Sequence, residues 1–478
     1  MTFMDLGFLL FFSLAAAVYY LVPGRWQNAA LLGASWVFYA FSTPQWLPVL
    51  MLDSLAVYLL GRRIGAAAGP ARKRWLAGGI AVTLGLLALL RAASAALHTD
   101  AFTLALPLGL SFFTLQALGY LIDVYRGNYA AEKSFVNLAL FVSFFCCVIS
   151  GPIERGNNLL PQLAKPRRFA PDKAPHALLH LAFGYLFKVA AADLLAVYAN
   201  AVYGDVHAYT GLALTAGALC YGFQLYFDFA GYSLLALGFA ELLGIRINKN
   251  FDTPYFSRSI KEFWSRWHMS LSAWLREYVY IPLGGNRKGP ARKALNLVLT
   301  FLASGLWHGT GLTFLVWGLL HGLYQAAENL LPRKKPGESR LADFLGWLVT
   351  FLLVQVAWVF FRAGSLSDAL YVLTAQFSGV SLAGLWAAVF GAYNAVFQTQ
   401  LLVYAALAFT LLACGLCVLC DCWKRFRAPD GDLAAAALGL PAVRRWVLYY
   451  GLAAVVFAGF LLNNGYFATA ANTLYQNF

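Results

Sequence analysis

Long apolar stretches alternate with short polar links along the whole chain. A helix needs about 20 apolar residues to cross the hydrocarbon core of a bilayer, and several stretches reach or approach this length. The pattern predicts an all-α polytopic membrane protein with about 11–13 helical elements, some of them short or re-entrant. The apolar stretches cover residues 6–22, 31–40, 46–60, 76–97, 102–122, 135–149, 177–202, 212–229, 295–303, 312–331, 344–361, 401–419 and 447–462.

The composition points the same way, since 61% of the 478 residues are hydrophobic and 12% are charged. A soluble domain is nearer half apolar and a quarter charged. The first stretch lacks a basic leader and a small-residue cleavage site, which predicts a retained helix and not a signal peptide. We expect one membrane domain, 1–478, made of N-terminal helices (1–245), a charged block (246–293), histidine-bearing helices (294–331) and C-terminal helices (332–478).

The net charge of +14 is concentrated in links between the apolar stretches. Links rich in Lys and Arg face the cytoplasm by the positive-inside rule. The block 246–293 is therefore predicted to be cytoplasmic, whereas the N-terminus and the links 98–101 and 204–209 are predicted to lie outside. These basic links suit anionic lipid heads and phosphate-bearing substrates better than nucleic acid. The other basic clusters are residues 62–74, 165–173, 333–340, 424–427 and 444–445.

Residues 135–150 do not fit a simple alternation of spans. Arg126, Lys133 and Arg155 flank this segment, and all three are predicted to lie inside. The segment must therefore re-enter the membrane or form a pair of short helices, before a break at 150–155. Irregular backbone at this depth is tolerated only when it is buried in protein or lines a cavity. The segment therefore indicates a central cavity.

The block 246–293 contains a predicted amphipathic helix. Ser259 and Glu262 have the spacing of a capping box, and Pro282 ends the pattern. Three tryptophans on the apolar face and bases on the other predict a helix that lies in the membrane interface. The apolar face holds Ile260, Phe263, Trp264, Trp267, Leu271, Trp274, Leu275 and Tyr278.

Three histidines in or beside apolar sequence are candidates for chemistry. His268 lies at the border of the apolar face, where it either points at a buried site or snorkels to the interface. His308 lies between two apolar stretches, and an imidazole at that depth is either catalytic or a hydrogen-bonded structural group. His321 would lie about 140° around an unbroken helix from His308, so we expect it to be structural or peripheral.

A third group of polar residues lies within the apolar stretch 212–229. Gln224 and Asp228 are four residues apart and share a helical face, with Tyr226 between them in sequence. Such a face either lines a cavity or forms hydrogen bonds that hold two helices together.

The spacing of the seven cysteines does not predict a metal site. A continuous helix would spread Cys414, Cys417, Cys420 and Cys422 around its circumference. We expect them to pack as small apolar residues, with lipidation of Cys420 or Cys422 as the lesser alternative.

Taken in order, these segments resemble the membrane-bound O-acyltransferase family, in its bacterial branch of alginate, peptidoglycan and cellulose O-acetyltransferases. The chain departs from the family pattern at Glu277, where Asp is usual, and at Ala230 and Leu234, where Ser and Asp are common. The matching segments span the chain and are 107–113 (PLGLSFF), 120–126 (YLIDVYR), 151–155 (GPIER), 224–233 (QLYFDFAGYS), 262–268 (EFWSRWH), 281–287 (IPLGGNR), 306–309 (LWHG) and 358–362 (WVFFR).

The resemblance implies a site as well as a fold. It implies helices around a tunnel, with His308 as the general base and His268 as the residue that positions the thioester or stabilises charge. Acetyl-CoA would be the acyl donor, with no bound cofactor and no metal. The supporting residues would be Gln224, Tyr226, Asp228, Trp307, Glu277 and His321. Either coenzyme A phosphates or lipid heads would contact Arg266, Arg276, Arg287 and Lys288.

The same resemblance implies a partner and a location. The acetyl group would pass from the cytoplasm across the bacterial inner membrane to a periplasmic hydrolase-like (SGNH) O-acetyltransferase that acylates a polysaccharide. A transporter or flippase of a polysaccharide precursor is the alternative, since broken helices with polar groups at mid-membrane are also expected there. A scaffolding protein, the third interpretation, predicts no cavity.

Overall fold

The computed structural model describes residues 1–96, 106–330, 339–428 and 431–467. The chain divides into two compact units, of which unit 1 comprises residues 1–178 with 235–249 and unit 2 comprises 179–234 with 250–478. The predicted outer link 98–101 lies outside the described residues. So do the start of the predicted helix 102–122 and most of the basic cluster 333–340.

Apolar helices build unit 1, together with the start of α8 and the end of α10. A core of phenylalanines holds α1, α2 and α10 together, since Phe8 packs on Phe38 and Phe239 with ring centroids 5.6 and 4.9 Å apart. The helices are α1 (Leu6–Leu21), α2 (Gln27–Ser42), α3 (Leu47–Ala66), α4 (Gly69–Ala96), α5 (Leu110–Arg126), α6 (Phe135–Ser143), α7 (Gly156–Leu163) and α8 (Ala174–Tyr185), with 3₁₀ turns η1 (Gly24–Trp26) and η2 (Pro44–Trp46).

The segment 135–150 is one short helix followed by turns, and not the pair of short helices that was one of the two expectations. Helix α6 has nine residues, and the turns after it lead to α7. Residues 138–154 are all buried, so this irregular backbone is enclosed by protein.

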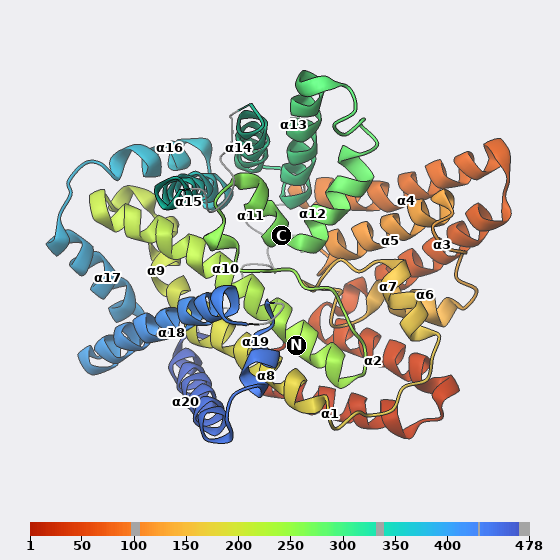
Figure 1. Cartoon of the computed structure of the whole chain (residues 1–478), viewed down its shortest axis with the longest axis horizontal. Helices are drawn as coiled ribbons and strands as arrows, with labels where there is room; N and C mark the ends of the chain where they lie inside the picture. The colour runs from red at the N-terminus through yellow and green to blue at the C-terminus, as the bar shows by residue number, and fades with distance from the viewer. Residues whose placement is uncertain (97–105, 331–338, 429–430, 468–478) are drawn as a thin grey trace. The chain divides into compact units, whose positions relative to one another are not determined.

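Unit 2 contains the remaining helices (Figure 1). They are η3 (Leu186–Ala192, a π-helix), α9 (Asp193–Gly204), η4 (Val206–Ala208), α10 (Gly211–Leu242), η5 (Pro254–Phe256), α11 (Ile260–Arg266), α12 (Met269–Leu275), η6 (Arg276–Tyr280, a π-helix), α13 (Gly289–His308), α14 (Leu312–Glu328), α15 (Arg340–Arg362), α16 (Leu366–Ala375), α17 (Leu382–Phe397), α18 (Gln400–Phe426), α19 (Leu433–Leu438) and α20 (Ala442–Phe467).

This is an all-α multi-pass membrane protein. Within the described ranges, six helical segments are long and apolar enough to cross a bilayer, namely Gly69–Ser94, Ala174–Gly204, Gly211–Leu242, Arg340–Arg362, Gln400–Phe426 and Ala442–Asn463. The same ranges hold twenty α-helices, more than the 11–13 elements expected. The excess arises because short helices such as α7, α16 and α19 form in the links, and because the interfacial helix is broken.

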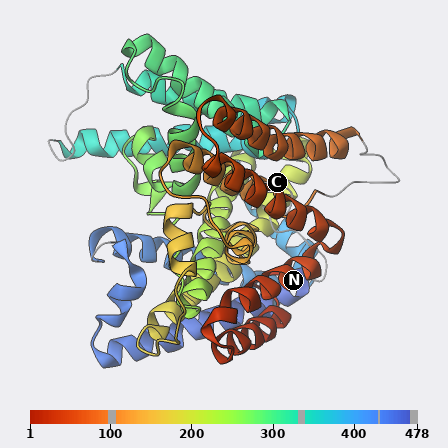
Figure 2. The same cartoon turned by 90° about the vertical axis from the view of Figure 1, so that its right-hand side faces the viewer.

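Helices α13 and α14 form a tight antiparallel hairpin, which Figures 1 and 2 show as neighbouring green and teal helices. A Cβ atom at Gly305 would lie 2.4 Å from the carbonyl oxygen of Phe314, and one at Gly318 would lie 2.4 Å from that of Phe301. Only glycine permits this approach, which brings the end of α13 against α14.

Candidate active site

His308 is the last residue of α13 and is 7% exposed. Aromatic rings surround its imidazole. The ring centroids of Trp307, Phe361 and Trp317 lie 4.7, 4.9 and 5.0 Å from that of His308. The hairpin supplies Trp317 from α14, and α15 supplies Phe361. The imidazole is therefore packed among aromatic rings from α13, α14 and α15.

His268 interrupts the predicted amphipathic helix. The predicted N-cap at Ser259 forms, because Ser259 Oγ accepts from the Glu262 N–H at 3.0 Å, while Glu262 Oε2 accepts from the Arg258 N–H at 2.9 Å. Helix α11 then ends at Arg266, and His268 adopts the left-handed conformation at φ 42° before α12 begins. The prediction of one continuous helix was wrong, and so was the placement of His268 on its border. No glycine or proline marks the break in the sequence.

The tryptophans of this segment pack on protein and do not form the lipid-facing anchor we expected. Trp264, Trp267 and Trp274 are 6%, 3% and 5% exposed. Trp264 lies against Phe301, and Trp267 lies 4.9 Å from Trp358 of α15. The periodicity of the apolar face was correct, but periodicity alone does not distinguish burial in protein from burial in lipid.

The two candidate catalytic histidines share one aromatic neighbour. The Trp307 ring lies 4.7 Å from the His308 ring and 6.1 Å from the His268 ring. Phe229 of α10 also packs on His268, with ring centroids 4.7 Å apart and an angle of 87° between the ring planes. We call His268, Trp307 and His308 the histidine centre. Burial lowers the pKa of His268 to about 3, so this imidazole is neutral at physiological pH.

His321 joins the same group of rings, because the chain breaks at 309–311 and turns α14 back along α13. The 140° argument assumed an unbroken helix, and the structure removes that assumption. The Trp317 ring lies 5.0 Å from His308 and 5.1 Å from His321. His321 Nδ1 also accepts from Trp264 Nε1–H at 3.2 Å. Its expected supporting role stays a prediction.

The polar face of α10 is tied to other helices. Lys188 Nζ lies 2.5 Å from Asp228 Oδ1 and 2.6 Å from Asp193 Oδ1, with all three residues buried. We call these three the lysine centre. Tyr226 donates to Asp421 Oδ2 of α18 at 2.8 Å. Gln224 is buried, and its Oε1 has no hydrogen-bond partner among the described residues. Asp228 and Tyr226 therefore join α10 to other helices, which is one of the two roles that the sequence predicted for this polar face.

Sequence reasoning missed Lys188, Asp193 and Asp421. Lys188 sits in the apolar run LFKVAAAD, where the pattern of a span hides a single charge. The available signal was the charge itself, since a lysine inside a span needs a buried partner. Sequence reasoning also missed Asn250, which accepts hydrogen bonds from Met269 and Ser270 of α12.

The basic residues proposed for phosphate binding fall into two groups. Arg266 forms ion pairs with Glu262 at 3.1 Å and Asp252 at 3.5 Å. Arg276, Arg287 and Lys288 are exposed, and no ion pair involves them in the part of the chain that the structure describes. Glu277 is exposed beside Arg276 on η6. Arg266 is thus committed to its own segment, and the other three are open to solvent.

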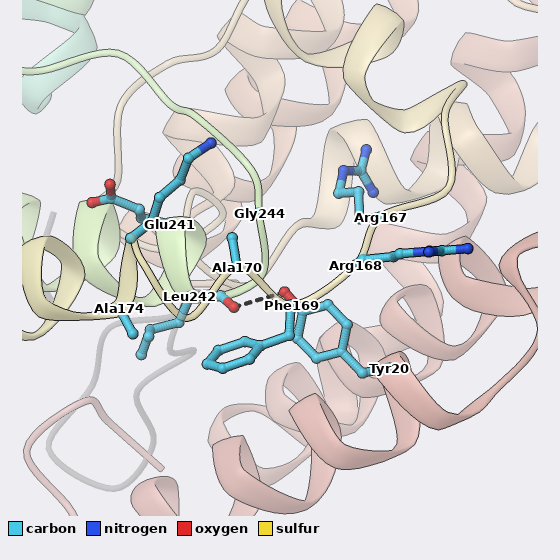
Figure 3. Close-up of a pocket in the computed structure, with 10 residues that line it drawn as sticks. Tyr20, Arg167, Arg168, Phe169, Ala170, Ala174, Glu241, Leu242 and Gly244 are labelled. Atoms are coloured by element: carbon cyan, nitrogen blue, oxygen red, sulfur yellow. Dashed lines mark hydrogen bonds between the residues drawn. The ribbon is translucent and has the colours of Figure 1, made fainter.

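A separate hollow of about 170 Å³ lies in unit 1 (Figure 3). Tyr20 and Phe169 form one wall, where the Tyr20 hydroxyl donates to the Leu242 carbonyl at 2.8 Å. Arg167, Arg168 and Lys173 make it basic, but Glu241 also lines it. It holds none of the predicted site residues, so we do not assign acyl transfer to it.

The family described as MBOAT, membrane-bound O-acyltransferase family, matches residues 130–334, which include both candidate catalytic histidines. A probable alginate O-acetylase of Azotobacter vinelandii is 40% identical over 384 residues, covering 77% of this chain and 76% of its own length.

More distant relatives carry other activities in their names. A peptidoglycan O-acetyltransferase of Helicobacter pylori is 35% identical over 80% of each chain. A teichoic acid D-alanyltransferase of Streptococcus thermophilus is 30% identical over 55% of this chain and 69% of its own length. The fold, the matched segment and these identities together show that this chain belongs to the membrane-bound O-acyltransferase family.

Proposed function

We propose that this protein moves an acetyl group from cytoplasmic acetyl-CoA across the bacterial inner membrane for the O-acetylation of an extracytoplasmic polysaccharide. The observation that carries the proposal is the histidine centre, in which two buried imidazoles pack on the single ring of Trp307. The names of the relatives support a polysaccharide such as alginate or peptidoglycan as the final acceptor.

His308 acts as the general base in this proposal. Its imidazole takes the proton from an attacking hydroxyl, whose oxygen bonds to the thioester carbonyl carbon. The carbon–sulfur bond then breaks, and the proton passes from His308 to the leaving thiolate of coenzyme A. The apolar rings around His308 keep water from competing with the hydroxyl.

His268 stabilises the developing charge. Because its pKa is lowered to about 3, the ring is neutral and carries one N–H. A neutral donor fixed in a dry site holds the thioester carbonyl and stabilises the oxyanion as it forms. This division gives each histidine a single task.

We place the block 246–293 in the cytoplasm and the N-terminus in the periplasm. Arg276, Arg287 and Lys288 then face the compartment that supplies acetyl-CoA, and their exposure suits contact with its phosphates. Arg266 drops out of this role, because Glu262 and Asp252 already hold it. A periplasmic SGNH-type O-acetyltransferase would receive the acetyl group.

Sealed vesicles of known orientation test the proposal. Radioactive acetyl-CoA is supplied to one side only, and label is counted on the partner transferase or a polymer mimic on the other side. We expect label only when acetyl-CoA is on the side of Arg287. Absence of transfer from either side would reject acyl transfer, and movement of a lipid-linked sugar in the same vesicles would favour the flippase.

A further inference from the structure

The backbone of His268 needs an explanation that its own sequence does not supply. A residue with a Cβ atom rarely adopts φ near +42°, and such a residue keeps that conformation only when its surroundings enforce it. His268 is also the N-cap residue of α12, yet its side chain makes no capping hydrogen bond. Another group must therefore satisfy the first N–H groups of α12.

Asn250 supplies those acceptors from eighteen residues earlier in the chain. Its backbone carbonyl accepts from the Met269 N–H at 2.9 Å. Its side-chain Oδ1 accepts from the Ser270 hydroxyl at 2.6 Å and from the Ser270 N–H at 3.4 Å. Met269 and Ser270 are the first two residues of α12, so Asn250 caps this helix in place of His268.

Asn250 is also fixed on its other side. It is 1% exposed, and its amide nitrogen donates to Ser233 Oγ of α10 at 3.4 Å. The same helix carries Phe229, whose ring packs on His268. Asn250 thus joins the start of α12 to the helix that contacts the imidazole.

We infer that Asn250 is a positioning residue for the proposed acyl transfer, holding His268 in its left-handed conformation so that the imidazole faces Phe229 and Trp307 and is not used as a cap. The inference rests on the proposed function of His268. The reactive geometry of His268 then depends on the hydrogen-bond acceptors of Asn250, and not only on the presence of α12.

Three variants test the inference. Asn250→Leu keeps a similar volume without an acceptor, and Asn250→Asp keeps oxygen acceptors toward Ser270. Asn463→Leu is the matched control, because it also removes a buried amide of unit 2, one that donates to the Val189 carbonyl at 2.6 Å. We expect Asn250→Leu to lower kcat at least about tenfold with KM for acetyl-CoA within about twofold, and the other two to keep kcat within about threefold.

Two further readouts separate positioning from general stability. In a His268→Gln background, adding Asn250→Leu should cause little further loss of kcat, because the positioned group is already gone. Amide hydrogen exchange of residues 269–275 should be faster in Asn250→Leu than in the parent or in Asn250→Asp. This exchange measurement does not depend on activity, so it still decides the capping claim if the parent transfers no acetyl group.

Parental kcat in Asn250→Leu would overturn the inference. So would equal losses in Asn250→Leu and Asn463→Leu, or unchanged exchange at residues 269–275. Absence of acetyl transfer by the unmodified protein would instead count against the proposed function.

Discussion

The lysine centre and the histidine centre lie in the same unit and are both buried, yet different contacts hold them. In the lysine centre, one ammonium lies between two carboxylates at 2.5 and 2.6 Å. In the histidine centre, Trp307 and its neighbours pack on the imidazoles with ring centroids 4.7–6.1 Å apart. Ion pairs join the residues of the lysine centre, whereas the residues of the histidine centre are held by the packing of aromatic rings.

This difference separates structural from chemical roles. A buried ion pair satisfies its own members, and removal of one member leaves an uncompensated charge. The imidazoles of the histidine centre pack on aromatic rings, and an imidazole can act as an acid, a base or a hydrogen-bond donor. We therefore expect changes in the lysine centre to affect folding and changes in the histidine centre to affect transfer.

Lys188→Met should have the largest effect on stability. It leaves Asp193 and Asp228 buried without their cation, which costs about 3–5 kcal/mol. Folded protein in detergent extracts, followed by size-exclusion profile and melting temperature, should fall sharply. The neutral triple variant Lys188→Met, Asp193→Asn, Asp228→Asn should recover most of it, and failure to recover would mean that the charges do more than balance one another.

Trp264→Ala should come next, with a loss of about 3 kcal/mol, because it empties the space between Phe301 and Trp317. The control variant is Trp386→Ala in α17, because Trp386 is 52% exposed and the same substitution is then made at a surface position. Thermal unfolding of the two variants in detergent and in lipid compares protein packing with lipid anchoring. Equal, lipid-dependent losses in both would restore the idea that Trp264 anchors the membrane surface.

His321→Ala should have a smaller effect on stability and a mild effect on transfer. It leaves the Trp264 N–H without its acceptor, at a cost of about 1–3 kcal/mol. Transfer per folded molecule should stay well above that of His308→Ala. A larger loss of transfer in His321→Ala than in His308→Ala would indicate that His321, and not His308, is the general base.

Much of the fold could be predicted from the chain itself. Apolar length located the spans, and the spacing of Ser259 and Glu262 located the start of α11. These features depend on local chemistry, namely hydrophobic length and side-chain capping.

The rest depends on contacts between distant residues. The left-handed turn at His268 has no local signal, because the acceptors that hold it belong to Asn250. Lys188 finds Asp228 forty residues away, on another helix. The burial of Trp264 depends on α14, which the sequence pattern of α11 does not describe. Such pairings are set by packing, and periodicity cannot identify the partner.

Replacement of His308 tests the central claim most directly. His308→Ala and His308→Gln should both abolish acetyl transfer while expression and melting temperature stay close to the parent. Neither side chain accepts a proton at neutral pH, although Gln keeps hydrogen-bonding groups of similar reach. The measurement is label transferred from acetyl-CoA per folded molecule in oriented vesicles. Near-parental transfer by His308→Gln would show that His308 is a structural histidine and contradict the account.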